Sequence, residues 1–454
     1  MSPDRGGEIA IRERMTNGPV APLIRRLAVP SVIGMLTTAI YNMADTFFVS
    51  QISTAASAAV GISLPLMTII QAAGFMFAMG GSSLISRHLG AKRKKEADQV
   101  LATALFGVTV LTLFIFAIGQ LFLEPMLLAF GATKTALPYA ADYTSIILYG
   151  APLLGTSFVL NHALRAQGRN VLSMIGLTAG GVLNILLDPL LIFTFDLGIA
   201  GAAIATVIST GISLVILIVM LKTKSVLTFR FSAISRKLSD YVAIGKIGLS
   251  SLLRQTLGSI AALLQNNQAS AFGDSALAAV TIVTRMSMIL LSIALGIGQG
   301  FQPVAGYNHG AEKYKRVADA WRYTYLLMLS VIGSLAVLFF IFAPSVLRLF
   351  RPDDPLVTEI GTLSLRLHAF GIVAMPFQIS TNMLMQSTGQ AKEAAFLSTT
   401  RQGIFFIPLI LILPPIFSLL GVQLAQPTAD VLSSAAAVPL LVHYIRRLRQ
   451  NQPR

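Results

Sequence analysis

Residues 199–221 read IAGAAIATVISTGISLVILIVML, and residues 222–240, directly after them, read KTKSVLTFRFSAISRKLSD. The first stretch carries no charged side chain and exceeds the roughly 20 apolar residues that a helix needs to cross a lipid bilayer. The second stretch is polar and basic, as expected of a connection on the cytoplasmic side of a membrane. This junction predicts an integral membrane protein built from helices.

The composition of all 454 residues indicates the same class. Hydrophobic residues make up 54% and charged residues only 12%, whereas a soluble globular chain is about 25% charged. Too little polar surface remains for a soluble protein, and the hydrophobicity is too high for a disordered one. Because the chain has no cysteine, disulfides, thiolate metal sites and a cysteine nucleophile are excluded.

A scan for further stretches of roughly 20 mostly apolar residues predicts twelve membrane-spanning helices. Their approximate ranges are 28–50, 57–86, 99–123, 138–164, 171–196, 199–221, 241–271, 277–306, 317–343, 358–387, 393–417 and 420–445. The N-terminus is charged and lacks the apolar core and cleavage site of a secretory signal. We therefore expect the first span to remain as a membrane anchor.

The distribution of Lys and Arg predicts the orientation of these spans. The chain has 34 such residues and a net charge of +15. Nearly all of those outside the spans fall in the tails and in connections on one side; the exceptions are Lys134, Arg348 and Arg351. We attribute this asymmetry to the positive-inside bias rather than to nucleic-acid binding. The sequence thus predicts a multi-pass protein of a bacterial-type inner (plasma) membrane, with both termini cytoplasmic and no nucleic-acid partner.

The second half of the chain repeats the first. The string AAVGI at 58–62 recurs as AAVTI at 278–282, and Gly90-Ala91 recurs as Gly310-Ala311, both at a shift of 220. With an even number of spans in each half, both halves begin on the cytoplasmic side. They are therefore parallel repeats, related by an axis along the membrane normal.

These observations predict an all-α integral membrane protein, with twelve transmembrane helices in two six-helix bundles related by a pseudo-two-fold along the membrane normal. The predicted parts are a cytoplasmic N-terminal tail at 1–27, an N-lobe at 28–221, a cytoplasmic linker at 222–240, a C-lobe at 241–446 and a cytoplasmic tail at 447–454. Transporters of this kind hold the substrate between the halves and rock one half against the other. The chain has no P-loop, HExxH or G-x-S-x-G motif, so we expect neither ATP-driven transport nor an enzyme.

Two acidic residues lie deep inside predicted spans, where a charge costs several kcal/mol and is a functional candidate by default. Asp188 shares a helix face with Asn184, four residues before it, and Asn42 and Tyr41 stand three and four residues before Asp45. Carboxylates with amide and hydroxyl oxygens suit a proton or a hard cation such as Na⁺. We interpret Asp45, Asn184 and Asp188 as a coupling site for H⁺ or Na⁺, the alternative being a hydrogen bond or ion pair between packed helices.

The second half lacks these acids, since Gln265 stands where Asp45 falls at the shift of 220. Amides, an arginine and flexible thioethers in the spans are candidates for a substrate cavity, the alternative being inter-helix hydrogen bonds and apolar core. These candidates are Gln265, Asn266, Arg285, Met67, Met76, Gln378 and Asn382.

Four stretches carry a family resemblance: Asn42-Met-Ala-Asp45-Thr46, Asn184-Ile-Leu-Leu-Asp188-Pro189, Gly198-Ile-Ala-Gly201-Ala-Ala-Ile-Ala-Thr206 and Gln426-Pro427-Thr428-Ala429-Asp430. Together with twelve spans in two halves, they resemble the multidrug and toxic compound extrusion (MATE) family over nearly the whole chain beyond its first 25 residues. The resemblance implies export of cationic and amphipathic drugs in exchange for protons or sodium. In the branch with an acid cluster in the N-terminal lobe, it places coupling on Asp45, Asn184, Asp188 and Thr206.

The resulting hypothesis is a monomeric secondary antiporter, embedded in the lipid bilayer, that expels structurally varied, cationic or amphipathic organic compounds by alternating access between the two lobes. It requires no cofactor other than H⁺ or Na⁺. A flippase of related architecture for a lipid-linked oligosaccharide or peptidoglycan precursor is the alternative, because Arg254, Arg285 and Arg401 could serve a pyrophosphate group. An intramembrane aspartyl protease is disfavoured, since the chain lacks the Gly-x-Gly-Asp signature of that class.

Overall fold

The computed structural model describes residues 3–450, and residues 1–2 and 451–454, the outer ends of the two predicted tails, lie outside the described residues. Every regular element in this described part is helical. The first half comprises α1 (Pro3–Asn17), α2 (Val20–Ser50), α3 (Thr54–Gly90), α4 (Lys94–Leu121), α5 (Leu123–Ala129), α6 (Leu137–Ala166), α7 (Asn170–Pro189), the π-helical segment η1 (Leu190–Thr194) and α8 (Gly198–Lys224). The second comprises the 3-10 turn η2 (Phe231–Ala233), α9 (Leu238–Ser270), α10 (Asp274–Gly310), α11 (Tyr314–Phe350), α12 (Pro355–Ile372), α13 (Met375–Ser387), α14 (Ala391–Thr399), the π-helical segment η3 (Thr400–Phe406), α15 (Ile407–Phe417) and α16 (Leu419–Gln450).

Eleven helical segments in the described residues are long and apolar enough to cross a membrane, and the pair α12 and α13, bent by 46°, makes a twelfth. Each predicted span overlaps one of these segments, so the predicted fold class is confirmed. At the bend, the carbonyl of Ala374 accepts from the backbone N–H of Phe377 at 3.2 Å and also from Ser434 Oγ on α16 at 2.7 Å. A neighbouring helix thus satisfies the broken backbone, as a span in lipid requires.

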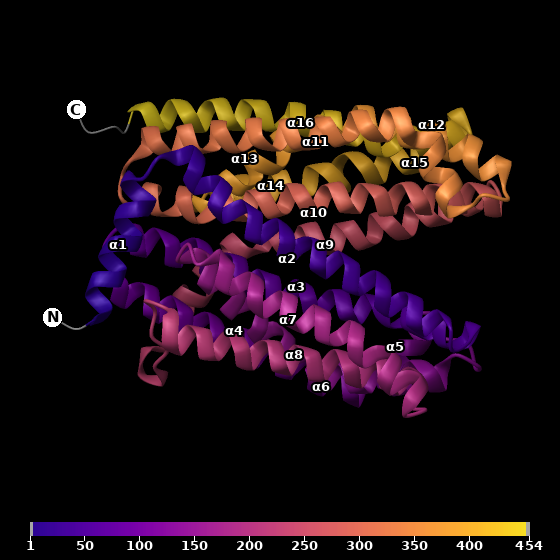
Figure 1. The fold of residues 1–454 in the computed structure, drawn as a ribbon, viewed down its shortest axis with the longest axis horizontal. Helices are drawn as coiled ribbons and strands as arrows, with labels where there is room; N and C mark the ends of the chain where they lie inside the picture. Colours follow the sequence, from indigo (N-terminus) through magenta and orange to yellow (C-terminus); the bar gives the residue numbers. More distant parts are fainter. Residues whose placement is uncertain (1–2, 451–454) are drawn as a thin grey trace.

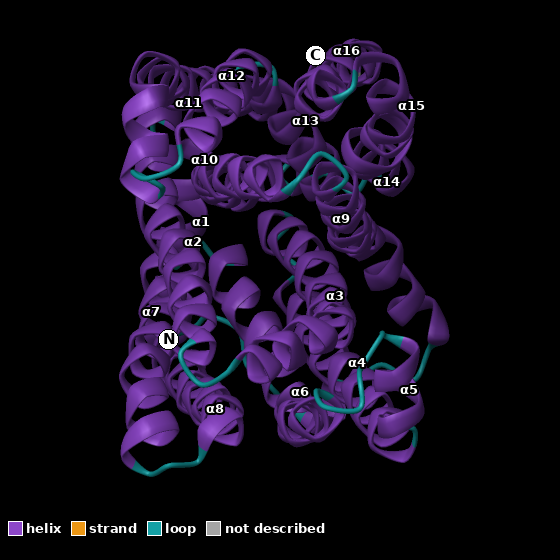
Figure 2. Ribbon diagram, turned by 90° about the vertical axis from the view of Figure 1, so that its right-hand side faces the viewer, coloured by secondary structure: helices purple, strands orange, loops and turns teal. Residues whose placement is uncertain are grey.

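The two halves of the chain form two layers of helices that meet along a central seam (Figure 1). At this seam α2 packs against both α7 and α10, and α3 packs against both α6 and α9. Seen end-on, α2 and α3 lie next to α10 and α9 of the other layer (Figure 2). These two helices of each half therefore make most of the contact between the halves.

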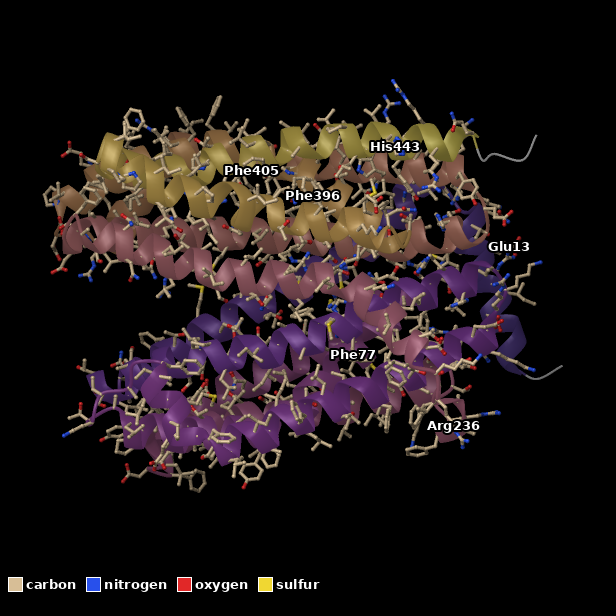
Figure 3. The ribbon with its side chains drawn as sticks, turned by 180° about the vertical axis from the view of Figure 1, so that it is seen from behind. Glu13, Phe77, Arg236, Phe396, Phe405 and His443 are labelled. Carbon is tan, nitrogen blue, oxygen red and sulfur yellow. The ribbon has the colours of Figure 1, made fainter. Side chains whose placement is uncertain are left out.

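The ribbons of the two halves converge at the end that holds both termini and diverge toward the other end (Figure 1). The buried apolar clusters follow this shape. The largest cluster runs from Ile11 to Leu448 and contains residues of both halves, whereas the other three are each confined to one half. Glu13 of α1, Arg236 of the linker and His443 of α16 all lie at the converging end (Figure 3).

The sequence repeat is also a repeat of hydrogen bonds. Asn161 Nδ2 donates to the carbonyl of Ser173 at 2.9 Å, and Asn382 Nδ2 donates to the carbonyl of Ala394 at 3.0 Å. Both members of the second pair stand 221 positions after those of the first. The same backbone geometry is therefore built twice.

Helix α1 lies across the converging end, within the predicted tail, and α2 already begins at Val20. Arg12 Nε donates to the carbonyl of Gly90 at 3.0 Å, at the end of α3 in the first half. In the second half, Asn308 Nδ2 on α10 donates to the carbonyl of Met15 at 3.0 Å. The first helix is thus bound to both halves.

Candidate functional site

Helix α7 supplies the most deeply buried acid of the first half. Asp188 is 0% exposed and Asn184 is 2% exposed, and Asn184 Nδ2 donates to Asp188 Oδ1 at 3.3 Å. The α-helix ends at Pro189, which has no N–H to donate, and continues as the π-helical segment η1. π-helical turns are often found at functional sites. The i, i+4 spacing predicted from the sequence therefore places both side chains in one buried group.

Helix α8 adds Thr206 to this group. Asn184 Nδ2 also lies 3.4 Å from Thr206 Oγ1, so one amide group contacts both the acid on its own helix and the hydroxyl of the next. The three residues Asn184, Asp188 and Thr206 thus form one polar cluster between α7 and α8.

Helix α2 brings the second acid to the same place. Asp45 lies close enough to Asp188 for the two carboxylates to interact electrostatically, and Tyr41, one turn before Asp45, packs against Gly181 of α7. Asn42 is exposed, and no described residue accepts a hydrogen bond from its side chain.

Tyr143 of α6 belongs to this cluster, although sequence analysis did not identify it. It is 0% exposed and lies within electrostatic range of Asp45 and Asp188. Its hydroxyl lies 3.9 Å from Met67 Sδ. Its neighbour in the sequence, Asp142, is exposed, and the partners of Tyr143 come from other helices, so no local pattern signals its place in the cluster.

Three buried oxygens of this acid cluster have no hydrogen-bond partner within the described chain: Asp45 Oδ1, Asn184 Oδ1 and Asp188 Oδ2. Buried polar atoms of this kind are normally paired. A proton on one carboxylate, or a hard cation coordinated by carboxylate and amide oxygens, would pair them. The described residues contain no group of three or more His, Asp or Glu that could hold a metal ion, so the amide and hydroxyl oxygens would have to complete any cation site.

The second half contains a cavity of about 360 Å³ between α9, α10, α12–α14, η3 and α16. Of the cavity candidates from the sequence, Gln265, Gln378 and Asn382 line it, and Asn266, Arg285, Met67 and Met76 do not. Asn266 and Arg285 are exposed. Met67 lies beside Tyr143 in the first half, and the Met76 backbone lies against Gly248 of α9.

The charged side chains of the cavity come from three helical segments. Arg401, in η3, makes an ion pair with Asp430 of α16, with 2.7 Å between Nε and Oδ1. Gln426 Nε2 donates to the same carboxylate oxygen at 2.8 Å. Arg254 of α9 and His368 of α12 also line the cavity. Sequence analysis named Arg254 and Arg401 as possible partners of a pyrophosphate group and did not assign them to this cavity.

Three comparisons relate the chain to known proteins. The family model described as MatE matches residues 30–190 and 249–412. The multidrug export protein MepA of Staphylococcus saprophyticus is 26% identical over 421 residues, which cover 92% of each chain. MepA of Staphylococcus aureus strain N315 is 28% identical over 437 residues, which cover 94% of each chain.

Solved structures with the same fold include transporters of the MOP superfamily. An outward-facing multidrug resistance MATE family transporter of the MOP superfamily matches with a TM-score of 0.91 at 26% identity, covering 96% of this chain and 98% of the other. A MOP superfamily transporter from Pyrococcus furiosus matches with a TM-score of 0.89 at 26% identity over the same shares of the two chains.

Proposed function

Because the chain belongs to the MatE family, we propose that it is a multidrug export protein that exchanges H⁺ or Na⁺ for cationic or amphipathic organic compounds. The observation that carries the proposal is the acid cluster, in which α2 and α7 bring Asp45 and Asp188 together and leave three buried oxygens unpaired. Buried charges without a partner are costly. Binding of a coupling cation removes that cost. The cluster is therefore a suitable site at which an H⁺ or Na⁺ gradient can drive export.

The shape of the molecule supports an alternating-access mechanism. The halves are closed at the end that carries both termini and the basic linker, and they diverge at the other (Figure 1). By the positive-inside bias we assign the closed end to the cytoplasmic side, and the apolar clusters confined to single halves support a looser contact between the halves on the other side. Both halves and the site belong to one chain, so a monomer in the plasma membrane suffices.

Helix α2 can connect the cluster to the contact between the halves. It carries Asp45 on the side of α7 and also packs along α10 of the second half. When one H⁺ or Na⁺ neutralises one of the two carboxylates, the repulsion between Asp45 and Asp188 is removed. Helix α2 then moves relative to α7. Because α2 packs along α10, this movement is passed to the second half. By this mechanism cation entry from outside drives release of the exported compound.

The test is gradient-driven efflux of ethidium from proteoliposomes that contain the purified protein. We expect Asp45→Asn and Asp188→Asn each to abolish the dependence of efflux on an imposed gradient, since an amide cannot take up the cation as a carboxylate does. Asp142→Asn is the matched control, because Asp142 is an exposed aspartate of the same half. If both cluster variants respond to the gradient like the wild type, the assignment is wrong.

The coupling ion is identified in the same vesicles. A pH jump at constant sodium and a sodium jump at constant pH are imposed separately on vesicles loaded with ethidium. The ion whose jump accelerates efflux in the wild type, and not in Asp188→Asn, is the coupling ion.

A further inference from the structure

The cavity of the second half contains a positive charge that no acid of the described chain neutralises. Arg401 is paired with Asp430, whereas Arg254 has no carboxylate within 4.0 Å and donates no hydrogen bond among residues 3–450. Arg254 lines the cavity. Its guanidinium is therefore available to a molecule that enters.

The groups around Arg254 leave it without a counter-charge. Across the seam, the titratable group that faces it is His162 of α6, which cannot supply a negative charge. On its own helix the next residue, Gln255, donates to Gln71 Oε1 of α3 at 3.1 Å. A guanidinium in a low-dielectric site without a partner attracts an anion strongly, and its planar donors match a carboxylate or a phosphate in two parallel hydrogen bonds.

The cavity also offers hydrogen-bond acceptors to the same molecule. Asn382 uses its amide N–H groups on the carbonyl of Ala394 and on Ser398 Oγ. Its Oδ1 is left buried and without a partner in the described chain, as is Oε1 of Gln402. Both residues line the cavity. Acceptors beside an unpaired arginine fit a ligand that carries an anionic group together with N–H or O–H donors.

We propose that this cavity binds the anionic end of an amphipathic substrate, with Arg254 as its counter-charge. The proposal rests on the proposed function, because it assigns one part of the same export path. The anionic group of such a substrate then adds to its affinity through Arg254, separately from any cationic group that it carries. The cavity volume of about 360 Å³ is within the range of pockets that hold drug-sized groups.

The test compares norfloxacin, which has a carboxylate, with its methyl ester, which keeps the amine and loses the anion. Binding to the full chain in lipid nanodiscs is measured by fluorescence anisotropy. We expect the wild type to bind the acid about tenfold more tightly than the ester, a difference of about 1.4 kcal/mol. Equal affinity for acid and ester, or no binding of either, overturns the proposal without any variant.

Variants locate the effect at Arg254. The preference for the acid should be lost in Arg254→Gln and kept in Arg254→Lys, which retains the charge. Arg348→Gln is the control, because Arg348 is exposed in the last turn of α11 and outside the cavity. A preference that persists in Arg254→Gln overturns the assignment.

Two further measurements separate the possible sources of failure. Farnesyl pyrophosphate and farnesol are used as competitors. Farnesyl pyrophosphate is compared with norfloxacin methyl ester and with added norfloxacin for the concentration at which each displaces bound norfloxacin. If farnesyl pyrophosphate acts at the lowest concentration, the natural anionic ligand is a lipid carrier. The proposed drug-like substrate class is then wrong. Ethidium has no anionic group, so its efflux tests the proposed function alone. If the wild type does not export ethidium, the proposed function is wrong, and the comparison of acid and ester binding still tests the role of Arg254.

Discussion

Gly90 at the end of α3 lies directly against the backbone carbonyl of Tyr307 in α10, so that a Cβ on Gly90 would overlap it. The repeat produces the same relationship in reverse, since a Cβ on Gly310 would overlap the carbonyl of Arg87. Positions 87 and 90 of the first half correspond to 307 and 310 of the second at the shift of 220. The converging end is thus closed by two equivalent backbone contacts that only glycine permits.

We predict that Gly90→Ala and Gly310→Ala destabilise the closed end, because a backbone atom cannot move away as a side chain can. Overpacking of this kind costs about 1–3 kcal/mol. Gly61→Ala on α3 is the control, since no atom lies within 4 Å of its added Cβ. The measurement is the thermal unfolding midpoint in nanodiscs; a midpoint for Gly90→Ala equal to that of Gly61→Ala would contradict the contact.

Because Arg401 and Asp430 form an ion pair, we predict that replacing one of them lowers the free energy of unfolding more than replacing both. Asp430→Asn leaves Arg401 unpaired and should lower the free energy of unfolding by about 3 kcal/mol, the lower end for buried pairs, because the Arg401 side chain is 15% exposed. Arg401→Met combined with Asp430→Leu should restore most of this loss. The free energy of unfolding is measured by denaturation for Asp430→Asn, for Arg401→Met and for the double variant. A loss in the double variant equal to the sum of the two single losses would contradict the prediction.

Asn184 is predicted to position Asp188 for coupling. Asn184→Ala removes the amide that contacts both Asp188 and Thr206, a charge-assisted interaction of about 1.5–3 kcal/mol. Gradient-driven ethidium efflux should fall by roughly tenfold, while ethidium binding is retained. Asn267→Ala, at an exposed site on α9, should transport like the wild type, and equal rates for the two variants would contradict the role.

Asp354, just before α12, gives a prediction about pH. Its carboxylate accepts hydrogen bonds from the backbone N–H of Val357 and Leu356 and from Ser275 Oγ. These bonds, that of Val357 first, lower the pKa of Asp354. The ionised cap therefore stabilises the fold above the ordinary aspartate pKa of about 4, and this stabilisation is lost as the pH falls through the lowered value.

The expected result is that wild type exceeds Asp354→Asn in thermal midpoint at pH 6, and that the difference narrows at pH 3. Asp353→Asn, at the neighbouring exposed position, should show no such change. A difference that stays constant between the two pH values would contradict the prediction.

Met15 is predicted to hold α1 against the bundle. Its side chain is 0% exposed, whereas Ile9 on the same helix is 58% exposed. Truncation of a buried Met to Ala costs about 2–5 kcal/mol, so Met15→Ala should detach α1 and accelerate tryptic cleavage at Arg12 and Arg14. Ile9→Ala is the control. Equal cleavage rates for the two variants would show that Met15 does not secure the helix.

Most of the fold was predictable from the sequence, because hydrophobic length determines where a chain crosses a bilayer. The twelve spans and the repeat at a shift of about 220 follow from local composition and spacing. Asn184 and Asp188 are also local, since residues four apart on a helix share a face. Helix α1 was missed because it is too short and polar to span, and its partners lie on α3 and α10.

The tertiary structure alone decided which groups meet across helices. It placed Asp45 within electrostatic range of Asp188, added Tyr143, paired Asp430 with Arg401, and left Arg254 without an acid among the described residues. The physical reason is that a span is determined by the transfer of its own side chains from water to lipid, which each stretch of sequence contains in full. The pairing of charges depends on distances between segments that are separated by tens to hundreds of residues, and these distances exist only in the packed bundle.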